Sequence, residues 1–150
     1  MTLAPAFWRG RELASFSSEE WEALCDGCGK CCLAKLECVD TREVHYTAVS
    51  CRLLDRDTAR CTDYANRHGR VPDCIAVSVD VARRDDVLPH SCSYRRLARG
   101  EDLPGWHPLL AGYQHSTVEA GESVAQRSIS EDNVPAEALE EYLIQWVETG

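Results

Sequence analysis

The feature that most constrains this chain is the run Cys25-Asp-Gly-Cys28-Gly-Lys-Cys31-Cys32, which places four cysteines within eight residues. Overlapping Cys-x2-Cys steps allow two thiolates to bind one metal ion while the intervening amides donate hydrogen bonds to sulfur. Cys31 and Cys32 are adjacent, and because neighbouring side chains diverge, binding of one tetrahedral ion by both would strain the backbone. Two close metal sites, one taking each sulfur, would relieve that strain. The run therefore predicts a metal centre rather than a set of small buried hydrophobic residues.

The remaining cysteines and the absence of export signals bear on the redox state of the thiols. The first ten residues lack the basic and apolar regions of a secretory signal, and no apolar run approaches the ~20 residues that span a bilayer. We therefore expect a soluble protein of a reducing compartment, the cytoplasm, where thiols bind metal rather than form disulfides. The further cysteines of this 150-residue chain are Cys38, Cys51, Cys61, Cys74 and Cys92.

The spacing of the first cysteines does not match a standard cofactor motif. Cys25, Cys28 and Cys31 satisfy the first three positions of a bacterial ferredoxin run, but Lys35 stands where the fourth cysteine belongs. A thioredoxin-like site would need one Cys-x2-Cys rather than two overlapping copies, and the Cys-x2-Cys-His of haem attachment is absent. The motif is therefore typical of metal binding without specifying a known cluster.

The charge of the chain disfavours two classes of partner. The formal net charge is −9, with 16 basic and 25 acidic residues. A field of that sign repels polyanions, so we expect binding neither to nucleic acid nor to an anionic membrane surface. The metal ions are the expected partners, and a protein partner docked on the apolar Trp106-His-Pro108 segment is an alternative.

Local patterns predict one α+β domain over residues 1–150, with an irregular cysteine-rich centre bound to metal. Ser17 and Glu20 form a capping-box pattern, and Phe16 and Trp21 occupy the positions of a hydrophobic staple, so a short helix should precede the first cysteine. Gly27 and Gly29 then favour a tight loop that turns backbone amides inward.

The later segments predict a β-hairpin, two short helices, a lone strand and a C-terminal helix. Residues 43–63 alternate strand formers with a charged turn, so a hairpin should carry Cys51 on one arm and Cys61 on the other. A short helix is expected from Ser78 to Asp86, capped by Ser78 or Asp80, a second short helix from Ser91, and a strand within 124–129. The final helix should begin with Pro135 as its first residue and present one apolar face. That face consists of Leu139, Leu143, Trp146 and Val147.

The five histidines are weaker ligand candidates than the cysteines. Each is better explained as a solvated or hydrogen-bonded side chain, and His90 is the strongest exception because Cys92 lies close to it in sequence. The sequence contains no Gly-x-Ser-x-Gly, no phosphate-binding glycine loop and no His-Glu-x-x-His. No enzyme class is therefore indicated.

Several stretches together resemble a known family, the YcgN-type cysteine-cluster proteins, which are small, largely uncharacterised bacterial proteins with a CxxCxxCC domain. The resemblance covers nearly the whole chain and implies chelation of zinc or iron, without implying a substrate. Relatives of this domain fused to methyl-transfer enzymes keep a redox role open. The stretches are Cys25 to Cys32, Cys51-Arg-Leu-Leu54, Cys61-Thr-Asp-Tyr64 with Arg67, Pro72-Asp-Cys74, Ser91-Cys92-Ser-Tyr94-Arg95 and Trp106-His-Pro-Leu109.

The resemblance also supplies a ligand set, because eight of the nine cysteines fall on the family pattern and Cys38 does not. Eight thiolates are enough for two four-cysteine sites, and closed sites of that kind favour structural zinc, since catalytic zinc keeps an open position. We expect two zinc ions. Iron, or an iron–sulfur cluster in a redox protein or oxidoreductase accessory, is the alternative. The expected ligands are Cys25, Cys28, Cys31, Cys32, Cys51, Cys61, Cys74 and Cys92.

Overall fold

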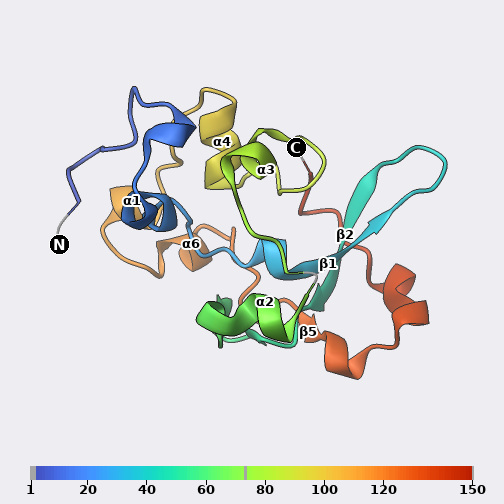
Figure 1. Ribbon diagram of the computed structural model, residues 1–150. Helices are drawn as coiled ribbons and strands as arrows, with labels where there is room; N and C mark the ends of the chain where they lie inside the picture. Colours follow the sequence, from blue (N-terminus) through green and yellow to red (C-terminus); the bar gives the residue numbers. More distant parts are fainter. Residues whose placement is uncertain (1–2, 73, 150) are drawn as a thin grey trace.

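The computed structural model describes residues 3–72 and 74–149, and its short helices and strands are joined by irregular segments (Figure 1). The α-helices are α1 (Ser18–Ala23), α2 (Arg67–Arg70), α3 (Val79–Arg83), α4 (Ser93–Ala98), α5 (Pro108–Ala111) and α6 (Ser116–Glu119). The strands are β1 (Leu33–Glu37), β2 (Val44–Ser50), β3 (Leu54–Asp55), β4 (Arg60–Cys61) and β5 (Ile129–Ser130). The 3-10 helices are η1 (Leu13–Ser15), η2 (Lys30–Cys32), η3 (Tyr64–Asn66), η4 (Glu131–Asn133) and η5 (Ala136–Tyr142). This mixture confirms the predicted α+β class.

The main sheet is built around β2, which has a neighbour on each side. β1 pairs with it antiparallel, with an irregularity in register between Leu33 and Lys35, and β5 pairs with it parallel. The prediction of a lone strand within 124–129 is therefore wrong: only Ile129 of that range lies in a strand, β5, and β5 pairs with β2. Figure 1 shows the β1–β2 hairpin extending to one side of the molecule. No helix in the described part of the chain is long and apolar enough to cross a membrane.

The predicted hairpin around the charged turn is present but shorter than expected. β3 and β4 pair antiparallel, with Leu54 opposite Cys61, so Cys61 lies on one arm as predicted. Cys51 does not lie on the other arm, because it directly follows β2 and precedes β3 by three residues. The residues of β2 were expected to lead into this hairpin, and they pair with β1 instead. The reason is that β1 offers a five-residue ladder, which satisfies more backbone groups than the two-residue β4.

The helix that precedes the first cysteine confirms its capping pattern. Ser17 Oγ accepts the backbone N–H of Glu20 at 3.2 Å, and Glu20 Oε1 accepts the backbone N–H of Ser17 at 2.9 Å. The rings of Phe16 and Trp21 lie 6.4 Å apart, as the staple predicted. The capping of α3 by Ser78 is also confirmed, whereas α4 begins one residue after Cys92.

The C-terminal segment differs from its prediction, because the expected α-helix is a 3-10 helix, η5, with Pro135 as its N-cap, and the chain then extends. Leu143 forms a bridge with Thr47, and the backbone N–H of Ile144 donates to Tyr46 O at 3.0 Å. Thr47 and Tyr46 are fully buried in β2, so their backbone groups need partners on this edge. Completing the sheet therefore takes precedence over continuing a helix.

Two buried hydrophobic clusters place the cysteines. The first joins the N-terminal segment to α3 and α4, with Leu24 and Leu88 fully buried, and Cys92 packs against it. The second lies on the sheet around Tyr46, and Cys32 packs against it. The cysteine-rich loop thus runs from one cluster to the other.

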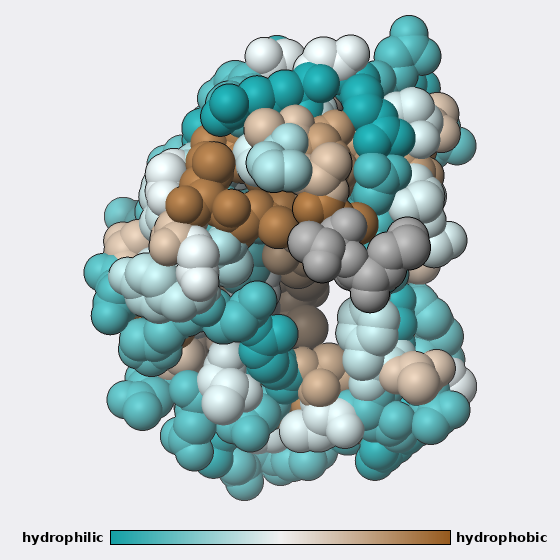
Figure 2. Space-filling model, turned by 90° about the vertical axis from the view of Figure 1, so that its left-hand side faces the viewer, coloured by the Kyte–Doolittle hydropathy of each residue, from teal (hydrophilic) through white to brown (hydrophobic). Residues whose placement is uncertain are grey.

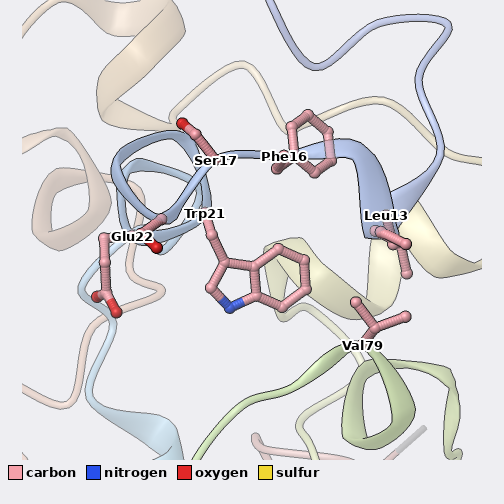
Figure 3. Close-up of a pocket in the computed structure, with 8 residues that line it drawn as sticks. Leu13, Phe16, Ser17, Trp21, Glu22 and Val79 are labelled. Atoms are coloured by element: carbon pink, nitrogen blue, oxygen red, sulfur yellow. The ribbon is translucent and has the colours of Figure 1, made fainter.

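The first cluster also reaches the surface. Figure 2 shows an apolar band on the side of the molecule where the N-terminal segment lies. A hollow of about 230 Å³ beside α1 is lined by residues 13, 14, 16–18, 21, 22 and 79, and Figure 3 shows the Trp21 indole lying between α1 and Val79. None of these lining residues is a cysteine, so this hollow is separate from the predicted site.

Candidate metal centre

The loop that follows α1 depends on two glycines with positive φ. Gly27 and Gly29 have φ of +73° and +75°, a left-handed conformation that residues with a Cβ rarely adopt. At Gly29 a Cβ would also lie 2.7 Å from Val124 Cγ2, so no larger residue fits. The predicted tight loop is therefore confirmed, and its backbone amides are free to turn toward the cysteines.

Backbone amides in this loop donate to sulfur, as the Cys-x2-Cys spacing predicts. The N–H of Gly27 donates to Cys25 Sγ at 3.4 Å, and the N–H of Lys30 donates to Cys28 Sγ at 3.5 Å. Farther along the chain, the N–H of Leu53 donates to Cys51 Sγ, also at 3.5 Å. Hydrogen bonds of this kind stabilise a thiolate and orient it for a metal ion.

The adjacent cysteines form the junction of the site within η2. The Cys32 thiol donates a hydrogen bond to Cys31 sulfur, which lowers the pKa of Cys31, while the same bond and burial raise the pKa of Cys32. The ammonium of Lys35 also lowers the pKa of Cys31, and Lys35 Nζ donates to the carbonyl oxygens of Cys31 and Leu33, both at 3.1 Å. Cys31 is thus the thiol of this pair that more readily becomes a thiolate.

One group of thiols surrounds Cys31. Burial raises the pKa of Cys28 and of Cys92, the latter to about 12, and the charge of Cys31 raises both further, whereas Cys25 is exposed. A contact between side chains brings Cys92 to this loop, because Lys30 Nζ lies 2.6 Å from Oγ of Ser91.

A second group surrounds Cys32. The backbone N–H of Cys51 donates to Cys32 O at 2.8 Å, and β3–β4 pairing holds Cys61 next to the Cys51 segment. Burial raises the pKa of Cys51 and of Cys74. The charges of Glu131 and Cys74 add to the shift of Cys51, and the charges of Cys31 and Cys61 add to that of Cys74. The charges of Cys51 and Cys74 likewise raise the pKa of Cys32.

Within residues 3–72 and 74–149, no three cysteine, histidine, aspartate or glutamate side chains form a ready-made metal site. Charges of some of the eight predicted thiols act on others, but within the described residues no three of them are arranged to hold an ion. The donor set still fits zinc or iron, since both accept four thiolates and several of these sulfurs already hold amide hydrogen bonds. Metal binding would therefore require these thiols to move closer together.

All nine cysteines lie in the described residues, and none forms a disulfide. Cys38 lies at the end of β1, where its backbone N–H bonds Glu43 O at 2.8 Å, and a hydrogen bond with Thr41 lowers the pKa of its thiol. No charge of another cysteine acts on it among the causes of that shift. Cys38 therefore stands apart from both groups.

The histidines do not enter the site. His90 is exposed, and its backbone N–H bonds Glu148 O at 2.6 Å. His107 is fully buried, but both its ring nitrogens are engaged: Nδ1 accepts the N–H of Leu109 at 3.0 Å, and Nε2 lies 2.7 Å from Leu24 O. This histidine holds the chain just before the first cysteine and is a structural residue.

Charged residues around the cysteines were not anticipated from the sequence. Asp26 is buried, and its Oδ1 accepts the N–H of Cys28 at 3.0 Å. Lys30 is buried and paired with Glu122, and the charge of Arg67 partly offsets the rise in the pKa of Cys74 that burial causes. The sequence feature that could have indicated the buried charges is the position of Asp26 and Lys30 inside the cysteine run. A loop with such closely spaced cysteines leaves little room for solvated side chains.

Comparison with known proteins places the chain in a family. The CxxCxxCC family model, described as "Putative zinc- or iron-chelating domain", matches residues 24–93. The UPF0260 protein of Parvibaculum lavamentivorans is 49% identical and the alignment covers 93% of this chain and 92% of the relative. A UPF0260 protein of Gluconobacter oxydans is 53% identical, and the alignment covers 93% of this chain and 85% of the relative. A UPF0260 protein of Marinobacter nauticus is 47% identical, and the alignment covers 94% of this chain and 95% of the relative. The chain belongs to the UPF0260 family.

Membership of UPF0260 confirms the resemblance predicted from the cysteine stretches. The region matched by the family model contains all eight predicted ligands, and it contains Cys38 as well, so the match does not separate the nine cysteines. No solved structure shows a significant match to this UPF0260 chain.

Proposed function

We propose that this UPF0260 protein binds zinc through eight cysteines and that the metal is mainly structural. Two zinc ions are the expected load, in a reducing compartment such as the cytoplasm. The proposed ligands are Cys25, Cys28, Cys31, Cys32, Cys51, Cys61, Cys74 and Cys92.

The observation that carries this proposal is the convergence of thiols from distant parts of the chain. The charge of Cys31 raises the pKa of Cys92, and the charges of Cys51 and Cys74 raise that of Cys32. These thiols affect one another although several helices and strands lie between them in the chain. Apolar thiols alone would not need backbone N–H donors directed at sulfur, whereas three of these sulfurs have them. Thiolates bound to metal use such donors.

The all-sulfur donor set favours a structural role. A four-thiolate zinc site has no open position for water or substrate, so zinc bound there would cross-link segments of the chain. The apolar cores are modest, and structural zinc can supply about 10–16 kcal/mol of apparent binding free energy in small peptides, comparable to the stability of a whole domain. Here zinc would hold the β3–β4 hairpin and α4 to the loop after α1.

The test is metal analysis of the full chain purified without oxygen, followed by addition of a strong chelator under reducing conditions. We expect about two zinc ions per chain, since eight thiols supply two four-thiolate sites, and we expect the protein to be colourless. Addition of the chelator should abolish cooperative folding, as measured by circular dichroism. A brown protein with visible charge-transfer absorption would show that the bound metal is iron rather than zinc. Apo-protein that stays cooperatively folded would overturn the structural role.

A further inference from the structure

The charges of this chain are unevenly distributed along its sequence. The whole chain carries 25 acidic and 16 basic residues, yet residues 52–70 contain five arginines and three aspartates. Residues 131–148 contain six acidic residues and no lysine or arginine. We call these two stretches the arginine segment and the acidic segment. Their charged residues of interest are Arg52, Arg56, Arg60, Arg67 and Arg70 in the first, and Glu131, Asp132, Glu137, Glu140, Glu141 and Glu148 in the second.

Most arginines of the arginine segment have no carboxylate partner. Among the residues that the structure describes, only Arg70 of this segment forms a salt bridge, with Asp63 at 3.0 Å. Six arginines elsewhere in the described chain do pair with carboxylates. Arg52, Arg56 and Arg60 are also exposed. The arginine segment therefore presents guanidinium groups that are free to bind an anionic partner.

An exposed tyrosine lies among these arginines. Tyr64 is 50% exposed, and the guanidinium carbon of Arg67 lies 3.7 Å from the centre of its ring. Arg67 also donates to the carbonyl oxygen of Tyr64 at 2.7 Å, so the stacked pair is held in place. Tyrosine and arginine contribute most to the binding energy of many protein interfaces, and ordered side chains lose little freedom on binding. This surface thus has the composition of an interface for a negatively charged protein.

The acidic segment lacks cationic partners in the same way. The five carboxylates of residues 131–141 are exposed, and none of them forms a salt bridge within residues 3–72 and 74–149. Farther along the segment, the side chain of Leu143 is 48% exposed. The acidic segment is therefore complementary in charge to the arginine segment, and each carries an exposed apolar residue.

The two segments are neighbours because of how the sheet is paired. β2 and β5 are parallel, with Ser50 opposite Ser130, so the chain leaves both strands at the same edge of the sheet. The backbone N–H of Arg52 donates to Glu131 Oε2 at 2.8 Å. Figure 1 shows α2 and the C-terminal 3-10 helices at the same lower side of the molecule. Two surfaces of opposite charge thus lie side by side, while their charged side chains do not pair with each other in the described chain.

Adjacent surfaces of opposite charge are self-complementary, because a two-fold axis between them places each one on its opposite in a second copy. We propose that this chain forms a symmetric dimer in which the arginine segment of each protomer contacts the acidic segment of the other. The contact gives the guanidinium groups and the carboxylates the partners that they lack within one chain. Tyr64 and Leu143 add apolar contact area to it.

A nucleic acid fits this surface less well than a second copy does. Its phosphates would be attracted by the arginines but repelled by the adjoining acidic segment and by the net charge of −9. A second copy presents the opposite charge to both segments. The dimer goes beyond the metal-binding function proposed above and does not depend on it.

Sedimentation velocity of the full chain as purified, under reducing conditions, tests the dimer. We expect a monomer–dimer equilibrium with a micromolar dissociation constant. The constant should rise at least about tenfold when the salt concentration is raised from about 0.1 M to about 1 M, since the Debye length falls from about 10 Å to about 3 Å.

Charge-reversed variants identify the contact. Arg52→Glu combined with Arg56→Glu should be monomeric, and so should Glu137→Lys combined with Glu141→Lys, because like charges then meet in each homodimer. An equimolar mixture of the two variants should form a heterodimer, since both contacts are attractive again. The matched control reverses two exposed arginines at the end of α3, Arg83→Glu with Arg84→Glu, and should dimerise as the wild type does.

Circular dichroism checks the fold of each variant. The lysine variant changes no residue next to a cysteine in the sequence, so it tests the dimer even if the glutamate variant fails to fold. A wild-type chain that stays monomeric at millimolar concentration in low salt, whether or not it binds single-stranded RNA, would overturn the proposal. A dimer that persists in the charge-reversed variants, or folded variants that stay monomeric when mixed, would also overturn it.

Discussion

Lys30 Nζ lies 2.5 Å from a carboxylate oxygen of Glu122, and the lysine side chain is only 3% exposed. The same ammonium is bonded to Ser91 and faces the Trp146 ring at 5.4 Å. A buried cation thus joins the cysteine loop to three segments that follow it at great distance along the chain. Because a buried charge without its partner is costly, this pair should matter more than any exposed ion pair.

Glu122→Gln should therefore destabilise the metal-loaded protein by about 2 kcal/mol, less than the ~3–5 kcal/mol of a fully buried pair because Glu122 is 31% exposed. Urea unfolding monitored by tryptophan fluorescence measures this loss. Glu37→Gln, which removes the exposed Arg42 pair, is the control and should change stability by about 0.5 kcal/mol or less. Equal effects of the two substitutions would contradict the role assigned to Lys30.

Substitution of either adjacent cysteine by serine should lower the zinc bound per chain, because Cys31 and Cys32 are both proposed ligands and each substitution removes one sulfur donor. Metal analysis of the two purified variants beside the wild-type protein measures the loss. Unchanged zinc content in both variants would remove these cysteines from the ligand set.

Cys38→Ser should leave zinc content and melting temperature close to those of the wild-type protein. The thiol lies at the end of β1, and its pKa is influenced by Thr41 and the local backbone rather than by the other cysteines. Atomic absorption and thermal unfolding test this expectation. Loss of one metal equivalent would show that the ligand set is wrong.

Ser17→Ala should destabilise the protein by about 1 kcal/mol, since the N-cap oxygen no longer accepts the Glu20 N–H. Urea unfolding of the metal-loaded protein checks the loss. Ser18→Ala leaves the capping box intact and serves as the control. A similar loss in both variants would argue that the capping box does not stabilise α1.

The partner of Ser17 in that capping box gives a pH dependence. Hydrogen bonds from Arg11 first, and then from the Ser17 backbone, lower the pKa of Glu20 to about 2. Because the folded pKa lies below the unfolded value of ~4.3, Glu20 stabilises the fold above that pH, and its contribution is lost as the pH falls toward 2.

Stability of the wild type compared with Glu20→Gln over this pH range isolates the effect of Glu20, since acid release of metal affects both proteins. We expect the difference in unfolding free energy to shrink as the pH falls from 5 toward 2. A difference that stays constant over this range would contradict the shifted pKa of Glu20.

The sequence by itself determined the features whose interactions span only a few residues. The α1 start follows from Ser17 and Glu20, three positions apart, and the left-handed turns at Gly27 and Gly29 follow from the absence of a Cβ. The amide bonds to Cys25 and Cys28 sulfur follow from the same short loop. In each case the partners are close in sequence, so the pattern is sufficient.

Only the tertiary structure decided which distant segments satisfy one another. The C-terminal residues follow an apolar pattern typical of a helix, yet Ile144 pairs with Tyr46 because a buried edge of β2 needs hydrogen-bond partners. The approach of distant cysteines likewise depends on contacts such as Cys51 with Cys32, and the pairing of Lys30 with Glu122 spans 92 residues. Burial and backbone pairing across such separations depend on how the chain folds back on itself, which no local pattern records.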